Sequence, residues 1–311
     1  MPQRSFQTHN AGTAFLGVWE VGQVLSDEQI AGFWRDGVLV AHDAVTPEQL
    51  SALRADWDAW VQESRAHSSA YGDTIDGRPR FDLQPGHSAE HPQLRRAQAP
   101  SEVSEAFYAA MTRSRMVEMV SDLIGPDVKH HHNKINSKQP GSDTEVKWHQ
   151  DFAFTPHTND SVVTALLMLD DVTDENGPLE VVSGTHRGEI FSLWHGGQFT
   201  GAVSPDVAGD LQSRAERCLG PAGSVCLMHT RLAHGSTANH SSSPRTLYIC
   251  VYSADDAVPC SPNPVPNAHE GTLVSGQRSG RIRTQDYEMQ LPEYPKQVSF
   301  FSQQSKTERG V

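Results

Sequence analysis

The segment Lys147-Trp148-His149-Gln150-Asp151 carries the strongest chemical signal in the chain. In an extended segment, side chains two residues apart lie on the same face, so His149 and Asp151 point the same way. An imidazole and a carboxylate are suitable ligands for Fe(II). The pair alone is weak support, because the chain contains 16 histidines. It predicts a metal site next to a strand if a third ligand exists elsewhere.

His234 is the candidate third ligand. It follows the apolar segment Val225–Met228, which reads as a strand, and lies in the turn-rich sequence Leu232-Ala233-His234-Gly235-Ser236. Two histidines and one carboxylate form the facial triad of non-haem iron enzymes. This triad leaves the opposite face of the iron open for a chelating co-substrate and O₂.

Arg245 lies 11 residues beyond His234, at the start of an expected strand over Thr246–Ser253. A guanidinium group binds a carboxylate through two parallel hydrogen bonds and stays charged in a partly buried pocket. We expect Arg245 to bind the distal carboxylate of 2-oxoglutarate, with Ser236 adding a hydrogen bond to the same group. Taken alone, Arg245 would be read as a surface ion-pair residue.

The expected elements change character along the chain. Capping-box sequences begin helices at Ser26 and Thr46, and another helical region starts at Ser101 and ends at Gly125-Pro126. Residues 68–100 are rich in Gly, Pro, Ser and Arg and read as a long irregular segment of the lid or binding-loop type. Strand-like segments then follow over residues 128–138, 162–169, 179–182, 223–228 and 246–253. Helices followed by many short strands predict an α+β fold built on a sandwich or small barrel.

Composition excludes several classes of function. The net charge of −13 is a poor match for nucleic acid or an anionic membrane surface. No apolar run approaches the roughly 20 residues that span a bilayer. The four cysteines lack a disulfide or zinc spacing and read as free thiols. The polar segment Met1–Ala14 lacks the apolar core of a signal peptide, so we expect a cytoplasmic protein. The sequence leaves the oligomeric state open.

Over residues 25–255 the chain resembles the phytanoyl-CoA dioxygenase (PhyH-like) branch of the Fe(II)/2-oxoglutarate oxygenases. The resemblance rests on several motifs in order, which makes it far more specific than any one of them. These are Leu25-Ser26-Asp27-Glu28-Gln29, Asp36-Gly37-Val38-Leu39-Val40, Trp148-His149-Gln150-Asp151, Asn176-Gly177-Pro178-Leu179, Val182-Ser183-Gly184-Thr185-His186-Arg187-Gly188, His234-Gly235-Ser236, Arg245 and Ser253-Ala254-Asp255.

The resemblance implies a double-stranded β-helix (jelly-roll) core with N-terminal helices packed on one sheet. It implies a single domain over residues 1–311, with a helical part at about 25–125, a core at about 128–255 and a C-terminal extension at 256–311. It implies Fe(II), 2-oxoglutarate and O₂ as cofactor and co-substrates, with His149, Asp151 and His234 on the metal. Hydroxylation of a small molecule, with release of succinate and CO₂, is the implied reaction. The residues expected around 2-oxoglutarate are Arg245, Ser236, Lys138, Asn133 and Thr164.

Other residues have weaker signals. In a strand, His130 and His132 would share a face, and we read the His130-His131-His132 run as the polar face of a strand. Arg281 and Arg283 read as part of a solvated tail, although the region could instead fold over the pocket. Five residues are candidates for the substrate pocket because they flank the metal motif or lie on an expected return segment: Gln150, Phe152, Phe154, His157 and Trp194.

Two alternatives use the same ligand set. One is a zinc-dependent hydrolase or lyase, and the other is a non-catalytic metal-binding jelly roll. Arg245 at a fixed offset from the triad argues against both, because zinc hydrolysis needs no anchor for a dicarboxylate.

Overall fold

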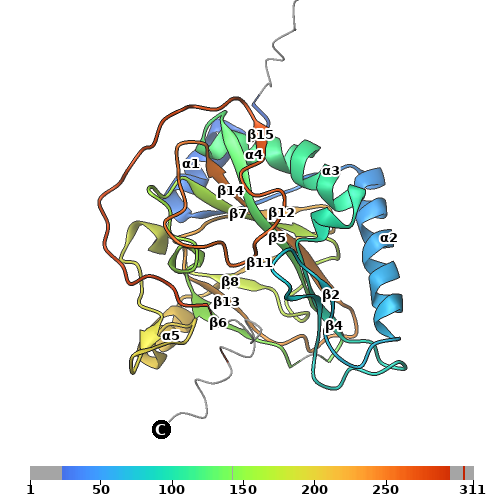
Figure 1. The fold of residues 1–311 in the computed structure, drawn as a ribbon. Coiled ribbons are helices and arrows are strands. Elements are labelled where there is room, and N and C mark those ends of the chain that lie inside the picture. The colour runs from blue at the N-terminus through green and yellow to red at the C-terminus, as the bar shows by residue number, and fades with distance from the viewer. Residues whose placement is uncertain (1–22, 142, 295–303, 305–311) are drawn as a thin grey trace, which may run out of the picture.

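The computed structural model describes residues 23–141, 143–294 and 304. Helices and antiparallel sheets are both present, as Figure 1 shows, so the α+β prediction is confirmed. Among the described helices, none combines the length and apolar character needed to cross a bilayer. The described helices are α1 (Asp27–Asp36), α2 (Pro47–Ser64), α3 (Glu105–Arg113), α4 (Arg115–Ile124) and α5 (Pro205–Ser213), with 3₁₀ turns at Pro100–Glu102, Asp151–Ala153 and Thr185–Arg187.

The strands form a large sheet, a small sheet and a hairpin. The large sheet has the order β1-β12-β7-β14-β5-β4-β3-β2, with β15 also paired to β5. The small sheet has the order β11-β8-β13-β6, and β9 and β10 form the hairpin. The bounds are β1 (Val38–Ala41), β2 (Tyr71–Asp73), β3 (Pro79–Leu83), β4 (Leu94–Gln98), β5 (Val128–Lys138), β6 (Val146–His149), β7 (Val162–Met168), β8 (Leu179–Val181), β9 (Trp194–His195), β10 (Gln198–Phe199), β11 (Glu216–Cys218), β12 (Val225–His229), β13 (His234–Ser236), β14 (Arg245–Ala254) and β15 (Leu273–Ser275).

The first two helices begin where the capping boxes predict. The hydroxyl of Ser26 accepts a hydrogen bond from the Gln29 backbone, and the Gln29 side-chain oxygen accepts one from the Ser26 backbone. Thr46 and Gln49 make the same reciprocal pair at the start of α2. Helix α1 ends at Gly37, which adopts a left-handed conformation with φ 83° that favours glycine.

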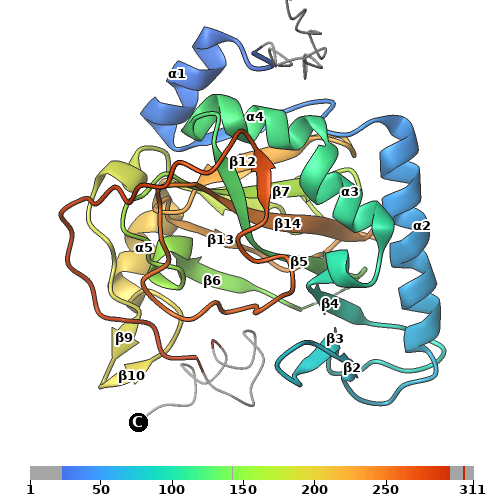
Figure 2. The same ribbon diagram turned by 45° about the horizontal axis from the view of Figure 1, so that its top comes forward.

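The two faces of the large sheet have different neighbours. One face packs against α1 to α4 in a core that includes Phe33, Leu53, Phe107, Tyr248 and Tyr252, and Figure 2 shows these helices lying along the sheet. A second apolar cluster joins Leu166 and Ile249 of the large sheet to Leu179 and Val181 of the small sheet. The two sheets therefore face each other, and the helices cover the outer side of one of them.

One expectation about the first half of the chain is wrong. Residues 68–100 do not form a long irregular segment, because β2, β3 and β4 lie there and extend the large sheet beyond β5. These strands are short and separated by turns, so apolar periodicity does not reveal them. The helical region after Ser101 is divided at Ser114 into α3 and α4.

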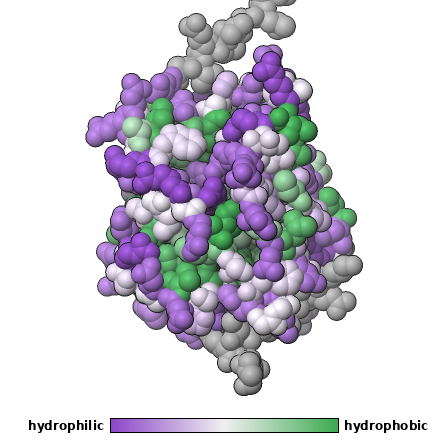
Figure 3. All heavy atoms as spheres, turned by 90° about the vertical axis from the view of Figure 1, so that its left-hand side faces the viewer, coloured by the Kyte–Doolittle hydropathy of each residue, from purple (hydrophilic) through white to green (hydrophobic). Residues whose placement is uncertain are grey.

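The C-terminal segment returns across the molecule, passing β15 and ending near α5 in both ribbon views (Figures 1 and 2). Arg283 is exposed, but it pairs with Asp256 at 3.0 Å and donates to the Ser161 hydroxyl, so it does not belong to a solvated tail. Figure 3 shows the side of the molecule that this segment crosses as mostly hydrophilic, with hydrophobic side chains scattered over its upper and lower parts. The segment Met1–Ala14 lies outside the described residues. All four cysteines are free thiols, as predicted.

Tyr252 links the large sheet to α3, since its buried hydroxyl donates to the Met111 carbonyl at 2.8 Å. Tyr252→Phe leaves that carbonyl without its donor and should lower the free energy of unfolding by about 1–2 kcal/mol. Urea denaturation measures this change. Tyr108→Phe, on the same helix, is the control and should change the unfolding free energy by less than about 0.5 kcal/mol. Equal effects of the two substitutions would contradict the assigned role of Tyr252.

Candidate metal centre and co-substrate pocket

Strand pairing brings the three predicted ligands together. On the small sheet, His234 of β13 lies opposite His149 of β6, and their ring centroids are 4.1 Å apart. Asp151 follows in the 3₁₀ turn after β6, and its Oδ1 is 3.5 Å from Nε2 of His149 and 3.6 Å from Nε2 of His234. The three donor atoms lie within 4.8 Å of one another. One metal ion can therefore contact all three.

Hydrogen bonds orient each ligand. Nδ1 of His149 lies 2.7 Å from the Lys147 carbonyl, and Nδ1 of His234 lies 3.0 Å from the Leu232 carbonyl. A carbonyl oxygen only accepts, so both Nδ1 atoms carry the proton and both Nε2 lone pairs face the shared centre. The Thr164 hydroxyl donates to Oδ2 of Asp151 at 2.7 Å, which leaves Oδ1 turned toward the imidazoles.

The electrostatics of the triad favour metal binding. Burial lowers the pKa of His234 to about 4, so its imidazole is neutral at pH 7. For Asp151 burial opposes ionisation, but the neighbouring His234, His149 and Lys134 outweigh it and hold the pKa of the carboxyl below its usual range. Two imidazoles and one carboxylate on the same side of a centre match the facial set that holds Fe(II). The residues present fit the predicted metal.

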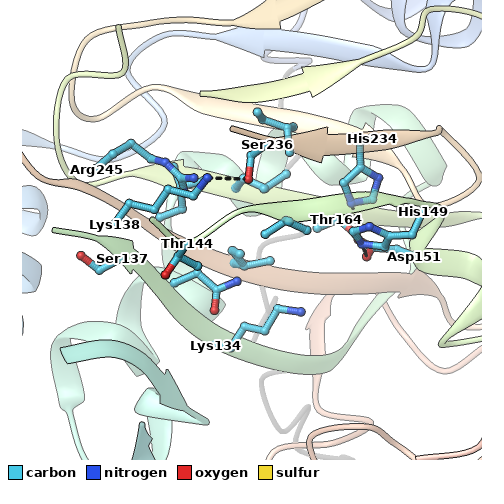
Figure 4. Close-up of a pocket in the computed structure, with 16 residues that line it drawn as sticks. Lys134, Ser137, Lys138, Thr144, His149, Asp151, Thr164, His234, Ser236 and Arg245 are labelled. Carbon is cyan, nitrogen blue, oxygen red and sulfur yellow. Dashed lines mark hydrogen bonds and ion pairs between the residues drawn. The ribbon is translucent and has the colours of Figure 1, made fainter. Parts of the chain in front are cut away.

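A cavity runs between the two sheets, with the triad at one end and a group of cations at the other (Figure 4). Arg245 and Lys138 lie opposite each other on β14 and β5, and the ammonium group of Lys138 donates to the Ser236 hydroxyl at 2.8 Å. Burial lowers the pKa of Arg245 to about 10, so it stays charged at neutral pH. The lining residues are Lys134, Asn136, Ser137, Lys138, Thr144, Val146, His149, Asp151, Thr164, Leu166, Leu179, His234, Ser236, Arg245, Leu247 and Ile249.

Gly177 positions the cationic end. Its carbonyl accepts from Nε of Arg245 at 2.9 Å, which aims the rest of the guanidinium away from the backbone. Gly177 has φ +77°, and a Cβ there would lie 2.7 Å from the Thr237 carbonyl oxygen and 2.9 Å from Cδ of Lys138. Only glycine fits at this position.

Asn133 does not line the cavity, so this prediction is wrong. Its amide donates to the Ser101 hydroxyl at 2.9 Å on the helix-covered side of β5. Residues five apart on a strand lie on opposite faces, so Asn133 and Lys138 point in opposite directions. Lys134 and Asn136, which are an even number of residues from Lys138, are two of the lining residues that sequence reasoning missed. Because alternate residues of a strand share a face, the position of Lys138 would have predicted both of them.

Gln150 is a second wrong prediction. Its side-chain nitrogen donates to the carbonyls of Glu189 and Arg231, and its oxygen accepts from the backbone of Phe191. The amide therefore joins loops beside the metal motif and is not available to a substrate.

The other four candidate substrate residues lie outside the cavity between the sheets. The ring of Phe154 meets His149 edge-on at 5.5 Å, and Trp194 lies further out, with its indole donating to Leu291. Phe152 is fully buried against Tyr287 of the C-terminal segment, and the ring of His157 packs on His131. Their contact with substrate stays a prediction.

The His130-His131-His132 run departs from the expected alternation. A β-bulge at His131 aligns His132 with Val251 and His130 with Tyr252. The ring of His130 bonds the Asn133 amide on the helix-covered side. His132 on β5 and Thr164 on β7 both pair with Val251 of β14, so they share the face that lines the cavity. The expectation that His130 and His132 share a face is therefore wrong.

Comparisons with known proteins agree with this geometry. The family model for phytanoyl-CoA dioxygenase (PhyH) matches residues 33–247. A probable alpha-ketoglutarate-dependent hypophosphite dioxygenase of Stutzerimonas stutzeri is 33% identical over 207 residues, covering 65% of this chain and 71% of that protein. L-proline trans-4-hydroxylase of Streptomyces griseoviridis is 29% identical over 205 residues, covering 60% and 75%. Ectoine dioxygenase of Halomonas elongata is 28% identical over 249 residues, covering 75% and 71%.

Solved structures show the same fold. The crystal structure of EctD from S. alaskensis with 2-oxoglutarate and 5-hydroxyectoine superposes with a TM-score of 0.58 at 24% identity, covering 74% of this chain and 76% of that one. The carbocyclase SnoK from nogalamycin biosynthesis gives a TM-score of 0.57 at 19% identity, covering 82% and 95%. The family match spans most of the chain and contains the whole triad with Arg245, and so the chain belongs to the phytanoyl-CoA dioxygenase (PhyH) family of Fe(II)- and 2-oxoglutarate-dependent oxygenases.

Proposed function

We propose that this dioxygenase hydroxylates a small polar molecule, with His149, Asp151 and His234 on Fe(II) and Arg245 on the distal carboxylate of 2-oxoglutarate. The observation that carries the assignment is the arrangement of the cavity. A preformed facial triad lies at one end, and at the other lies a buried guanidinium for which the described residues provide no ion pair. A dicarboxylate that chelates the metal with one carboxylate needs the triad at one end of the cavity and a cation for its second carboxylate at the other end.

The fold supports this assignment. Two facing antiparallel sheets with the triad between them are what a double-stranded β-helix provides, and we assign the core to that fold. The N-terminal helices, the paired sheets and the C-terminal segment then form one domain.

Each residue has a defined task in the reaction. Arg245 binds the distal carboxylate through its free guanidinium nitrogens, while Lys138 and Ser236 supply further donors beside it. Thr164 holds Asp151 so that a single oxygen faces the metal. Leu166, Leu179 and Ile249 line the space between and exclude water. Iron, when bound, supplies the oxidative decarboxylation of 2-oxoglutarate and the activation of O₂.

The proposed substrate class rests on the similar proteins. The similar proteins are named for hypophosphite, L-proline and ectoine. We infer a small polar substrate for this chain as well, and hydroxylation as the outcome. A zinc hydrolase on the same triad is disfavoured because it provides no anion for the buried guanidinium of Arg245.

The first test is the formation of the metal and co-substrate complex. Protein mixed with Fe(II) and 2-oxoglutarate without O₂ should develop a weak visible charge-transfer band, because the co-substrate chelates the metal. Asp151→Asn should abolish the band, and Asp210→Asn on the surface of α5 should retain it. Absorbance without O₂, followed by succinate detection after O₂ is admitted, gives the readout. A wild-type protein that binds zinc and yields neither band nor succinate would support the hydrolase instead.

The second test concerns Arg245. Arg245→Ala removes a two-point charged contact and should raise the 2-oxoglutarate concentration needed for half-saturation about 10- to 100-fold. Arg245→Lys should recover part of the loss, because a lysine keeps the charge but not the fork. Metal affinity should change little. Arg214→Ala, in an exposed ion pair on α5, is the control. An unchanged 2-oxoglutarate requirement in Arg245→Ala would assign the cationic end to another ligand.

The third test concerns Thr164. Thr164→Val preserves shape but removes the donor to Asp151, and should weaken Fe(II) binding about 10- to 100-fold. Anaerobic metal titration measures this, with Thr112→Val on α3 as the matched control. Loss of thermal stability without loss of metal affinity would show that the hydroxyl supports only the fold.

A further inference from the structure

Arg96 on β4 is a buried cation without a partner. The residue is 8% exposed, and its Nε atom makes no hydrogen bond. No hydrogen bond or ion pair reaches its guanidinium within the described ranges, whereas neighbouring Arg95 pairs with Asp82 at 2.8 Å. Burial lowers the pKa of Arg96 to about 10, which keeps it protonated at neutral pH. Asp82 lies opposite Arg96 in the β3–β4 register and its charge raises the pKa of Arg96, but its ion pair is with Arg95. A buried guanidinium that makes no ion pair of its own is costly, and an anionic ligand would compensate it.

The strand register turns Arg96 toward the cavity. Arg96 lies directly opposite Asn136 on β5, and directly opposed side chains share a face of the sheet. Asn136 lines the cavity, and its side-chain oxygen is also buried without a hydrogen-bond partner. The next residue, Ala97, packs on the opposite side with the helices. Arg96 is also close to Lys134. Burial is the largest cause that lowers the pKa of Lys134 to about 8, and the positive charge of Arg96 is the second.

Basic side chains outnumber acidic ones among the described residues around the cavity. Lys134, Lys138 and Arg245 line it, and Arg96 adjoins it, whereas Asp151 is the one acidic side chain among its described lining residues. Bound 2-oxoglutarate places one carboxylate on the metal and the other on Arg245, and its two charges offset those of Fe(II). The region around Arg96 then remains cationic.

We propose that Arg96 binds an oxyanion group of the primary substrate, a carboxylate or a phosphoryl group, at the β4–β5 side of the cavity. This inference rests on the proposed function and names the substrate class. The oxyanion accepts from the guanidinium fork, and the Asn136 amide and Lys134 adjoin it. Three strand spacings separate β4 from β7, which carries Thr164, a distance of about 14 Å. The substrate is therefore an anion whose charged group lies several bonds from the carbon that is oxidised.

Binding of two small probes tests the proposal on the holoenzyme. Protein with Fe(II) and saturating 2-oxoglutarate, without O₂, is titrated calorimetrically with methylphosphonate and with propionate. At least one probe should bind while 2-oxoglutarate stays bound, and which one binds decides between a phosphoryl and a carboxylate group. Arg96→Gln should weaken that binding at least about tenfold, and Arg96→Lys should recover part of it. Arg113→Gln, which removes a remote exposed arginine, should bind the probe as the wild type does.

Thermal stability separates a ligand-binding role from a structural one. Without the probe, Arg96→Gln should melt at the same temperature as the wild type or higher, because it removes an unpaired buried charge. Lower stability of Arg96→Gln, no probe binding beside 2-oxoglutarate, or equal binding by wild type and Arg96→Gln would each overturn the proposal. The charge-transfer band is recorded first in every sample. Its absence in the wild type is a failure of the proposed function, whereas a normal band with unaltered probe binding in Arg96→Gln is a failure of this inference alone.

Discussion

The backbone pairing of β13 with β6 is the interaction on which the site depends. It places His234 opposite His149, although the two are 85 residues apart in the sequence. A shift of this register by one residue would turn one imidazole to the other face of the sheet. The apolar cluster between the two sheets and the Gly177 turn hold the register, so packing far from the metal decides whether three ligands meet.

The cavity shows how a stable fold can hold a site that opposes folding. Arg245, Lys138 and Arg96 are all buried, and no acidic side chain among the described residues forms an ion pair with them. Such charges are costly in the ligand-free protein. The large apolar core between the helices and the sheet supplies the stability that tolerates them. Binding of anions then neutralises charge that the polypeptide leaves unbalanced, which couples ligand binding to the stability of the domain.

Much of this arrangement follows from local sequence patterns. Capping boxes located α1 and α2, apolar runs located β7 and β12, and the ordered motifs identified the triad and Arg245. Strands β2 to β4 were missed because their pairing is set by long-range backbone contacts and leaves no periodic pattern. Asn133 and the His130 face were misplaced for a related reason. Strand alternation and bulges decide where a side chain points, and no sequence pattern predicts the bulge at His131.

The return of the C-terminal segment has a consequence for how this scaffold diversifies. Beyond β15 the segment is held by side-chain and single backbone contacts, such as Gln285 to Thr158, rather than by a strand ladder. Tyr287 and Leu291 bring it against Phe152 and Trp194, beside the metal motif but away from the ligands themselves. Insertions and exchanges in this stretch leave the hydrogen-bonded sheets intact. Changes of sequence in this segment can therefore accumulate without displacing the metal ligands.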